Sequence, residues 1–406
     1  MIQTLRGMRD LEGDNARKYE HFISVATSVA KNAGFSLIQT PILEETKLFK
    51  RSVGESSDIV NKEMYNFTDK GENDVCLRPE NTAGVVRSYV ERKLDKQQNV
   101  ARYFYYGPMF RYERPQKGRF RQFYQFGCES FAKGSVYEDV SIIVIIADIF
   151  KQLNIDFTLE INSLGCKECR AKYNLLLGEK LHNLKDQYCT DCHTRMEKNP
   201  LRVLDCKVSS CQEINKNIPK INEHLCKGCK SDFDTLKHLL EIQKIAFSVN
   251  ANLVRGLDYY NKTAFEFVST QVGSQNAIAG GGRYDDLVGQ LGGSDTAGVG
   301  FAIGIDRILE LITPPSEREG TYLGFLCEEA KDLCLSLGFA KRKNEKIFLE
   351  YDCKKLKQHL KNADKANARY CAIIGEDELK NNQIWIKDLS EKQEQHENIN
   401  IWKGAN

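Results

Sequence analysis

The 406-residue sequence lacks any apolar run of membrane-spanning length, and its N-terminus has no apolar targeting core. Because a transmembrane helix needs roughly 20 consecutive apolar residues, we expect a cytoplasmic protein without a membrane partner. The formal net charge is only +2, which excludes a strong global field as a means of holding nucleic acid. Any contact with RNA must therefore come from local basic patches.

Three common catalytic signatures are also absent. No HExxH sequence occurs and the histidines do not cluster, which excludes the usual zinc protease site. The glycine cluster Gly280–Gly282 is not followed by Gly-Lys-Ser/Thr, so it is not a phosphate-binding P-loop. The glycines between Gly298 and Gly304 lack the spacing of a dinucleotide-binding fingerprint. We expect glycine there to allow close packing of a strand and a helix.

The segment from Phe110 to Glu129 combines many cations with interleaved aromatic residues. The flanks alternate aromatic and polar residues as half-buried strands do, and Pro115 and Gly118 interrupt the pattern where a turn is needed. This predicts a long antiparallel hairpin with a cationic loop, and the strand period of two places Gln125 and Glu129 on one face. Guanidinium groups bind phosphates in bidentate fashion. The alternative is a solvated charged hairpin, which would not need so many aromatic residues.

Two further segments carry a resemblance to a known family. One is LVRGLDYYNKTAFEF, residues 253–267, and the other runs from AIAGGGRYDDLVGQLGG to GVGFAIGIDRI, residues 277–308. With the hairpin they resemble the signature segments of class II aminoacyl-tRNA synthetases, and RGLDYY is similar to a segment peculiar to histidyl-tRNA synthetases. The resemblance covers nearly the whole chain, from RGMRD at Arg6 through LRPENTAG at Leu77 to IGEDELKNNQIWIKDL near the C-terminus.

The resemblance implies an α+β catalytic domain, with an antiparallel sheet and flanking helices, and a C-terminal α/β anticodon-binding domain. At Cys166 the composition becomes rich in Lys, Cys and helix formers, and the aromatic alternation resumes at Phe247. We therefore expect a helical insertion within the catalytic domain, and the stretch TPPSEREG has the composition of a linker. The predicted boundaries are 1–165 and 246–312 for the catalytic domain, 166–245 for the insertion, 313–320 for the linker and 321–406 for the anticodon-binding domain.

A helix is expected over Asn15–Ala33, followed by the strand-like FSLIQTPIL with Pro41 inside it. In class II synthetases a helix, strand and proline of this kind build the homodimer interface, so the resemblance implies a homodimer. An ordinary edge strand explains Pro41 equally well, because proline in a sheet belongs at an edge or a strand end.

The activity implied by the resemblance is the ATP-dependent activation of L-histidine and its transfer to the 3′ end of histidine tRNA. Charge builds up on the α-phosphate and the leaving pyrophosphate, so the site needs fixed cations aimed there. The candidates are Arg111, Arg255 and Arg307. By resemblance, Arg111 binds the α-phosphate and Arg307 the γ-phosphate. Arg255 contacts both the α-phosphate and the histidine carboxylate, at a place that Mg²⁺ fills in other class II enzymes.

The remaining substrate contacts are also implied by resemblance. For ATP they are Glu113, which reads the adenine amino group and helps to hold Mg²⁺, Phe123, on which adenine stacks, and Arg119. The histidine-binding set adds these residues to Arg111 and Arg255: Glu80, Asn81, Thr82, Gln125, Glu129, Tyr259 and Tyr260. Within it, Glu80, Thr82 and Gln125 would hold the ammonium group, and Glu129 and Tyr260 would read the imidazole. Asn81 stands where many relatives carry glycine or leucine.

The tip of the hairpin supplies the expected contact with the acceptor stem of tRNA. The resemblance assigns Arg114, Gln116 and Lys117 to the extra 5′ nucleotide of histidine tRNA. Gln116 can pair with base edges, whereas the cations can only position the backbone.

Eight of the fourteen cysteines occur as four closely spaced pairs in the expected insertion. They are Cys166 and Cys169, Cys189 and Cys192, Cys206 and Cys211, and Cys226 and Cys229. Eight thiols could form two four-cysteine zinc sites. The alternative is a set of reduced thiols, since many histidine enzymes build this insertion without cysteines.

One other function competes with tRNA charging. The synthetase-like regulatory subunit of histidine biosynthesis binds histidine but does not charge RNA. Such paralogues lack the anticodon-binding domain and the arginine of RGLDYY, and this chain has both.

Overall fold

The computed structural model describes residues 1–54, 57–97, 100–132, 134–206, 208–272, 277–315 and 317–403. Two compact units are present, Met1–Pro314 and Pro315–Asn406. Ser316, in the predicted linker, lies outside the described residues. No described helix is long and apolar enough to cross a membrane.

The arginine-rich hairpin is confirmed and forms the middle of a large sheet. Strands β5 (Ala101–Phe110) and β6 (Gln122–Ala132) are antiparallel, with Tyr103 opposite Glu129 and Phe110 opposite Gln122. The sheet has eight strands in the order β1-β5-β6-β11-β10-β9-β7-β8. Its outermost pairs, β1·β5 and β7·β8, are parallel and the other pairs are antiparallel. The remaining strands are β1 (Ser36–Leu37), β7 (Thr158–Ser163), β8 (Phe247–Val249), β9 (Asn261–Val268), β10 (Ala277–Arg283) and β11 (Ala297–Gly304).

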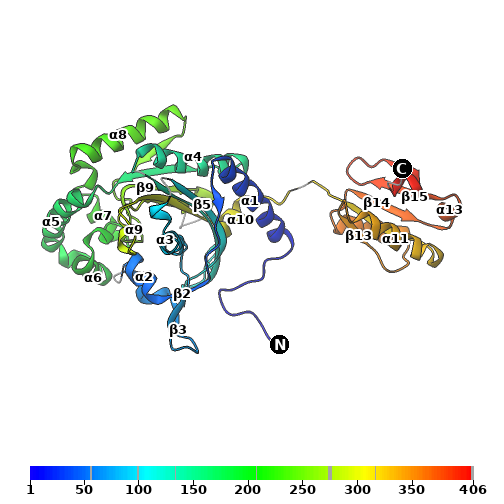
Figure 1. Ribbon diagram of the computed structural model, residues 1–406, viewed down its shortest axis with the longest axis horizontal. Coiled ribbons are helices and arrows are strands. Elements are labelled where there is room, and N and C mark those ends of the chain that lie inside the picture. Colours follow the sequence, from blue (N-terminus) through cyan, green and yellow to red (C-terminus); the bar gives the residue numbers. More distant parts are fainter. Residues whose placement is uncertain are drawn as a thin grey trace. The chain divides into compact units, whose positions relative to one another are not determined.

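One face of this sheet is covered by long helices. Helices α1 (Gly13–Asn32), α4 (Val136–Gln152) and α8 (Lys227–Ile242) lie along it (Figure 1). Phe22 of α1 and Ile146 of α4 pack in the same fully buried cluster as Phe126 of β6. Burying each such side chain contributes about 1.5–3 kcal/mol, so this layer is the main hydrophobic core of the unit.

The opposite face carries the smaller elements and, as described below, the pocket. Tyr105 and Phe131 of the hairpin point to this face and pack with Tyr89. Tyr89 belongs to α3 (Thr82–Glu91). The other elements here are α2 (Thr46–Val53), α9 (Leu287–Gln290), the π-helical turn η1 (Ile59–Glu63), the 3₁₀ turn η2 (Leu94–Lys96), and a three-stranded sheet of β2 (Leu43–Glu45), β4 (Asp74–Leu77) and β3 (Tyr65–Thr68). Helix α10 (Ile305–Leu311) and the 3₁₀ turn η6 (Thr270–Val272) instead pack with the main hydrophobic core, where α10 lies against α1.

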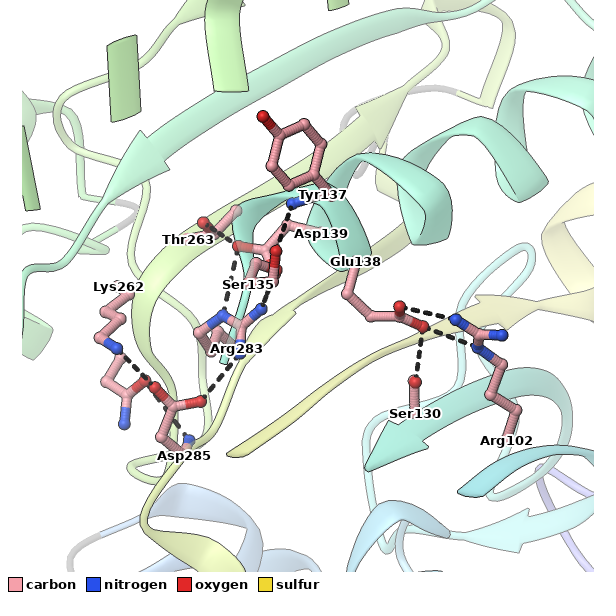
Figure 2. Close-up of polar contacts among 11 residues, drawn as sticks. Arg102, Ser130, Ser135, Tyr137, Glu138, Asp139, Lys262, Thr263, Arg283 and Asp285 are labelled. Carbon is pink, nitrogen blue, oxygen red and sulfur yellow. Dashed lines mark hydrogen bonds and ion pairs between the residues drawn. The ribbon is translucent and has the colours of Figure 1, made fainter. Parts of the chain in front are cut away.

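Helix α4 is tied to the sheet by a buried ionic network at its N-terminus (Figure 2). Ser135 caps the helix by accepting a hydrogen bond from the Tyr137 N–H at 3.3 Å. The Arg283 guanidinium of β10 forms an ion pair with Asp139 and a second, at 3.1 Å, with Asp285. Thr263 of β9 donates to the same Asp139 carboxylate.

A second ion pair reinforces this junction. Glu138 accepts two hydrogen bonds from Arg102, at 2.9 and 2.8 Å, and one from Ser130 at 2.7 Å (Figure 2). Bidentate pairs of this kind are the strong ones. Residues 138 and 139 thus fasten the first turn of α4 to both halves of the sheet.

The cysteine-bearing part of the chain is helical, as predicted. It ends in α8, described above, and otherwise consists of helices and turns beside the catalytic sheet, with α5–α7 grouped near α9 in Figure 1. They are α5 (Lys167–Asn183), α6 (Thr190–Lys198) and α7 (Ser209–Asn215), with 3₁₀ turns η3 (Lys185–Gln187), η4 (Pro200–Val203) and η5 (Ile221–Glu223).

The C-terminal unit is a five-stranded sheet in the order β13-β12-β14-β15-β16. The first three strands are parallel to one another and the last two pair antiparallel. Its strands are β12 (Thr321–Phe325), β13 (Ile347–Leu349), β14 (Tyr370–Ile374), β15 (Gln383–Asp388) and β16 (Glu394–Asn398); its helices are η7 (Glu328–Ala330), α11 (Lys331–Lys341), α12 (Leu356–Lys365), α13 (Glu376–Lys380) and α14 (Ile399–Trp402).

Candidate active site

A single pocket on the face of the sheet opposite α4 brings together most of the predicted substrate-binding residues. It lies between the hairpin, the segment before α3, the 255–260 segment and the N-terminus of α10. Eleven predicted site residues line it: Glu80, Thr82, Arg111, Glu113, Arg119, Phe123, Gln125, Arg255, Tyr259, Tyr260 and Arg307.

The three predicted catalytic arginines reach this pocket from three separate elements. Arg111 follows β5, donates its Nε–H to the Pro79 carbonyl at 2.9 Å, and lies 5.1 Å from the centre of the Phe123 ring. Arg255 donates to Glu266 at 2.6 Å, and Arg307 of α10 donates to the Ala277 carbonyl.

The positive charges are close enough to affect one another. Burial lowers the pKa of Arg111, and nearby Arg255 lowers that pKa as well, against the opposite effect of Glu63 and Glu80. Burial also lowers the pKa of Arg307, and Arg119 and Arg111 act in the same direction. A buried cluster of like charges is unfavourable by itself, so an anion bound among these arginines would be strongly stabilised.

Two polar atoms in the pocket have no hydrogen-bond partner among the described residues. They are Nε of Arg255 and Oε1 of Gln125, and both are buried. A buried unsatisfied polar group costs about 1–3 kcal/mol. A donor and an acceptor left unsatisfied in one pocket indicate that a polar ligand completes the site.

Glu80 is held at the N-terminus of α3. Its carboxylate accepts hydrogen bonds from the backbone N–H groups of Thr82, at 2.7 Å, and Ala83, at 3.0 Å. The Tyr259 hydroxyl donates to the same carboxylate at 3.4 Å. Burial nevertheless raises the pKa of Glu80 above its ordinary value.

Glu129 lies behind the pocket wall rather than on it. The carboxyl is fully buried and accepts hydrogen bonds from the hydroxyls of Thr82, at 2.6 Å, and Tyr284. Tyr105 donates a longer one, at 3.4 Å. Burial is the main reason that its pKa rises to about 8, although the Thr82 and Tyr284 bonds favour the ionised form.

Asn81 does not line the pocket. Its side-chain oxygen accepts hydrogen bonds from Thr40, at 2.6 Å, and from Arg78, at 3.2 Å. The residue therefore holds the segment before α3 in place, and the structure does not bring it together with the other predicted histidine-binding residues.

The predicted acceptor-stem residues form the exposed tip of the hairpin. Gln116 and Arg119 exchange two backbone hydrogen bonds, at 3.1 and 2.9 Å, around a turn in which Gly118 has a φ of +68°. This left-handed conformation favours glycine. Arg114, Gln116 and Lys117 are exposed, and Lys117 forms an ion pair with Glu310 at 3.4 Å.

The base of the loop connects to the ATP-binding candidates. Arg119 forms an ion pair with Glu113, and Gly118 and Arg119 both line the pocket. The turn at the end of the hairpin therefore contributes residues both to the exposed tip and to the lining of the pocket.

The glycine-rich strands make room for site side chains. A Cβ at Gly280 on β10 would clash with the Arg255 guanidinium, and one at Gly300 on β11 would clash with the Glu129 carboxylate. The sequence predicted that the glycines from 298 to 304 allow a strand and a helix to pack closely; at Gly300 the structure shows clearance for the Glu129 side chain. Arg283, in the same glycine motif, does not line the pocket and lies in the α4 network.

Several residues at the site were not found from the sequence. Glu266 pairs with Arg255, Tyr284 donates to Glu129, and Asp306 accepts from Arg9 at 2.7 Å and from the Tyr124 N–H at 2.7 Å. Tyr284 stands next to Arg283 in a motif that was noted, but its hydroxyl partner comes from a strand 155 positions away.

The eight paired cysteines gather into two clusters of four. Cluster A is Cys166, Cys169, Cys226 and Cys229, and cluster B is Cys189, Cys192, Cys206 and Cys211. Within each cluster all the Sγ atoms lie within 4.8 Å of one another. The Sγ–Sγ distance is 3.6 Å between Cys166 and Cys169, and 3.8 Å between Cys189 and Cys206.

The helices of this segment begin at the clusters. Cys166, Cys189 and Cys226 each directly precede a helix, namely α5, α6 and α8. A helix N-terminus stabilises a thiolate. Backbone N–H groups also donate to sulfur, from Cys226 to Cys169 at 3.1 Å and from Cys189 to Cys211 at 3.4 Å. All fourteen cysteines of the chain are free of disulfides.

Comparison with known proteins decides the family. The family model described as histidyl-tRNA synthetase matches residues 7–168 and 203–308, and that of an anticodon binding domain matches residues 312–401. The chain belongs to the histidyl-tRNA synthetase family. Residues 169–202, which include Cys189 and Cys192, fall outside the match.

Curated relatives and solved structures agree. The chain is 57% identical over 395 residues to the histidine–tRNA ligase of Sulfurovum sp. (strain NBC37-1), covering 97% of this chain and 98% of the relative. It is 56% identical, with the same coverage, to that of Sulfurimonas denitrificans. The crystal structure of apo S. aureus histidyl-tRNA synthetase has a TM-score of 0.81 at 30% identity, covering 99% of this chain and 100% of that one.

The family resemblance and the class II synthetase fold predicted from the sequence are therefore confirmed. Similarity to ligases over nearly the full length supports histidine–tRNA ligase activity and does not favour the regulatory alternative. Histidine, ATP and histidine tRNA are the substrates of this activity, and Mg²⁺ accompanies ATP in aminoacyl-tRNA synthetases generally.

Proposed function

We propose that this histidine–tRNA ligase forms histidyl-adenylate in the pocket lined by Arg111, Arg255 and Arg307. The histidine carboxylate attacks the α-phosphate of ATP, the bond to the bridging oxygen breaks, and pyrophosphate leaves. Arg111 stabilises the α-phosphate, Arg307 the γ-phosphate, and Arg255 both the α-phosphate and the carboxylate of histidine. The observation that carries this assignment is the convergence of the three arginines on one pocket. In the transfer step the 3′-terminal ribose hydroxyl of the tRNA attacks the carbonyl carbon of histidyl-adenylate and AMP leaves, and a phosphate oxygen or the substrate histidine takes the hydroxyl proton as the base.

The ATP base is assigned to the hairpin side of the pocket. Adenine stacks on Phe123, and Glu113 accepts from its amino group and contributes to Mg²⁺ binding. Arg119, which forms an ion pair with Glu113, contacts the phosphates. All three side chains line the pocket next to Arg111, which supports a single continuous ATP site.

Histidine is assigned to the side of the pocket formed by α3 and the 255–260 segment. Glu80, Thr82 and Gln125 hold the ammonium group, and the unpartnered Oε1 of Gln125 supports this assignment. Tyr260 and Glu129 read the two imidazole nitrogens, with Tyr259 beside them. Glu129 acts on the ligand through the Thr82 hydroxyl, which lines the pocket and donates to Glu129 at 2.6 Å, since a hydroxyl group can donate and accept at the same time. An amino acid that lacks one of the imidazole nitrogens would leave a buried polar group of the site unpaired, so the site would bind it less well than histidine.

The hairpin tip is assigned to the acceptor stem of histidine tRNA, and residues 321–406 to the anticodon. Arg114 and Lys117 position the RNA backbone, and Gln116 contacts the extra 5′ nucleotide. Exposure of all three side chains supports this role.

A homodimer is proposed through the outer edge of the sheet. Strand β1 leaves one edge of the eight-stranded sheet open, and Leu37, Ile42 and Leu43 near it are 48%, 42% and 43% exposed. An open edge with exposed apolar side chains is a natural site for a second chain. Because fourteen free thiols persist in a reducing compartment, we also propose a cytoplasmic location.

Clusters A and B are proposed to bind one structural zinc ion each. Four thiolates at a Zn–S distance of about 2.3 Å lie about 3.8 Å apart in a tetrahedron, close to the Sγ separations in both clusters. Elemental analysis of protein purified without chelator should find two zinc ions per chain. Cys189→Ser should lose one, whereas Cys334→Ala, a buried cysteine of the C-terminal unit outside both clusters, should lose none. Absence of metal with eight titratable thiols would favour reduced thiols.

Exchange of pyrophosphate into ATP, measured with each of the twenty amino acids, tests the proposed activity. Only histidine should support rapid exchange. Equal exchange with another amino acid, or none with histidine, would refute the assignment of the pocket.

A further inference from the structure

The segment Arg255–Tyr260 carries three pocket residues but has no helix or strand of its own. It runs irregularly from β8 to β9, and Arg255, Tyr259 and Tyr260 line the pocket from it. The Asp258 N–H donates to the Val53 carbonyl at 3.2 Å, which anchors it on one side. Without a ladder of backbone hydrogen bonds, its position depends on neighbouring side chains.

Those side chains come from the cysteine-bearing helices. Arg202, four residues before Cys206, donates from Nη2 to the Gly256 carbonyl at 2.9 Å and from Nε to Asp258 Oδ1 at 3.0 Å. Asn199 donates to the same Asp258 oxygen at 2.8 Å. Arg202 is only 9% exposed, so these contacts are largely shielded from water.

Cluster A contributes a parallel contact. Arg170 directly follows Cys169 and donates from Nη1 to the Tyr260 carbonyl at 2.9 Å. Each cluster thus has, within four residues of one of its cysteines, an arginine that bonds to the same short segment.

The helices that carry these contacts are too short to be stable alone. Helix α6 has 9 residues, η4 has 4 and α7 has 7. Isolated helices below about 12–15 residues are marginal in water. Metal–thiolate bonds supply folding free energy directly, so cluster B would fix the position of Asn199 and Arg202.

We propose that metal bound in cluster B positions the histidine-binding segment Arg255–Tyr260 through Arg202 and Asn199. This inference rests on the zinc binding proposed above. Arg202 is a positioning residue, because it contacts Gly256 and Asp258 and does not line the pocket. The ATP-binding residues Arg111, Phe123 and Arg307 are held by the hairpin and α10, so the binding of ATP should change little, whereas the binding of histidine and the orientation of its carboxylate by Arg255 should be affected.

The first experiment compares two arginine variants of the full-length, zinc-loaded enzyme. Arg202→Met should raise the histidine KM in pyrophosphate exchange about 10-fold or more, the scale of misplacing a binding group, with the ATP KM within twofold of the parent. The matched control is Arg195→Met: Arg195 lies on α6, the helix that precedes η4 and Arg202, and forms an ion pair with Asp58 at 3.3 Å, away from the segment. It should leave both constants unchanged. An unchanged histidine KM in Arg202→Met overturns the inference whether or not zinc is bound.

The second experiment asks whether the metal acts through Arg202. Zinc is removed with a chelator from the parent and from Arg202→Met. Removal should raise the histidine KM about 10-fold in the parent and little further in the variant, because both changes release the same contact. Equal increases in the two proteins, with zinc present beforehand, would overturn the inference and leave zinc binding intact. Absence of zinc in the purified parent would refute the zinc proposal and the inference with it.

Discussion

Two groups of arginines in the catalytic unit have opposite surroundings. Arg283 lies in the α4 network, where Asp139, Asp285 and the Ser135 carbonyl engage its guanidinium (Figure 2). Arg111, Arg255 and Arg307 share a pocket in which their charges repel, and Arg255 Nε has no hydrogen-bond partner among the described residues. A fully paired arginine stabilises the fold, whereas a cluster of like charges in a pocket is ready for an anionic ligand.

Replacing Arg283, the fully paired arginine, tests its contribution to stability. Arg283→Met should destabilise the protein by about 3–5 kcal/mol, because Asp139 is left as a buried, uncompensated charge. Chemical denaturation measures the loss. The double variant Arg283→Met/Asp139→Leu is the control and should recover much of the stability. A single variant as stable as the parent would show that the network contributes little.

Removing a pocket arginine should lower the activity and leave the stability nearly unchanged, the reverse of the effect expected for Arg283. Arg255→Ala should lower the rate of histidine-dependent pyrophosphate exchange by roughly 10²- to 10³-fold, the scale for deleting one preorganised charge-stabilising donor. The loss corresponds to about 2.7–4 kcal/mol of transition-state stabilisation. Its denaturation midpoint should stay near that of the parent. A variant with parental exchange would show that Arg255 does not act on the reacting groups.

The buried carboxyl of Glu129 should make the stability of the protein depend on pH. The pKa of Glu129 is raised from 4.5 to about 8 in the folded protein. Between these values the folded state binds more protons at this group than the unfolded state does. Its contribution to stability therefore decreases as pH rises through this window, by up to about 1.4 kcal/mol per pH unit.

Glu129→Gln isolates this contribution. Denaturation of the parent and of Glu129→Gln from pH 5 to 8 should show a shallower decline in the variant. Parallel curves would mean that Glu129 is ionised in the free enzyme, with its carboxylate satisfied by Thr82, Tyr284 and Tyr105.

The smallest expected effect concerns the exposed hairpin tip. Gln116→Ala should reduce discrimination against tRNA lacking the extra 5′ nucleotide by about 5- to 10-fold, within the range for one base contact. Lys117→Ala should weaken all tRNAs alike and flatten the salt dependence. Both half-reactions are measured, and adenylate formation should stay unchanged in both variants. Equal damage to adenylation would place the tip in the ATP site.

The elements with strong local patterns were the ones that the sequence could predict. The hairpin and α1 follow from their periodicity, and the observed bounds of α1 lie within two residues of those expected. The segment FSLIQTPIL was expected to form one strand, but it is divided between β1 (Ser36–Leu37) and the start of β2 at Leu43, with Pro41 between them. Strand β16, EQHEN, was not predicted because all its residues are polar and largely exposed.

The site shows the same division. Residues inside recognisable motifs reach the pocket, as Gln125 and Arg255 do. Glu266 and Tyr284 also lie inside the quoted segments, but their pairing with Arg255 and Glu129 is set by the three-dimensional arrangement of the strands, which the sequence pattern did not reveal. Likewise the cysteine pairs were visible, but which pairs share a cluster depends on the three-dimensional fold.

The binding of a non-hydrolysable histidyl-adenylate analogue, histidyl-sulfamoyl-adenosine, tests the contrast between the two groups of arginines most directly. Calorimetric titration would compare the parent with Arg255→Ala and with Arg283→Met at a temperature where all three are folded. The account predicts parental affinity in Arg283→Met and at least 10²-fold weaker binding in Arg255→Ala, because only the pocket arginine contacts the charged linkage. Equal affinity of Arg255→Ala and the parent would contradict it.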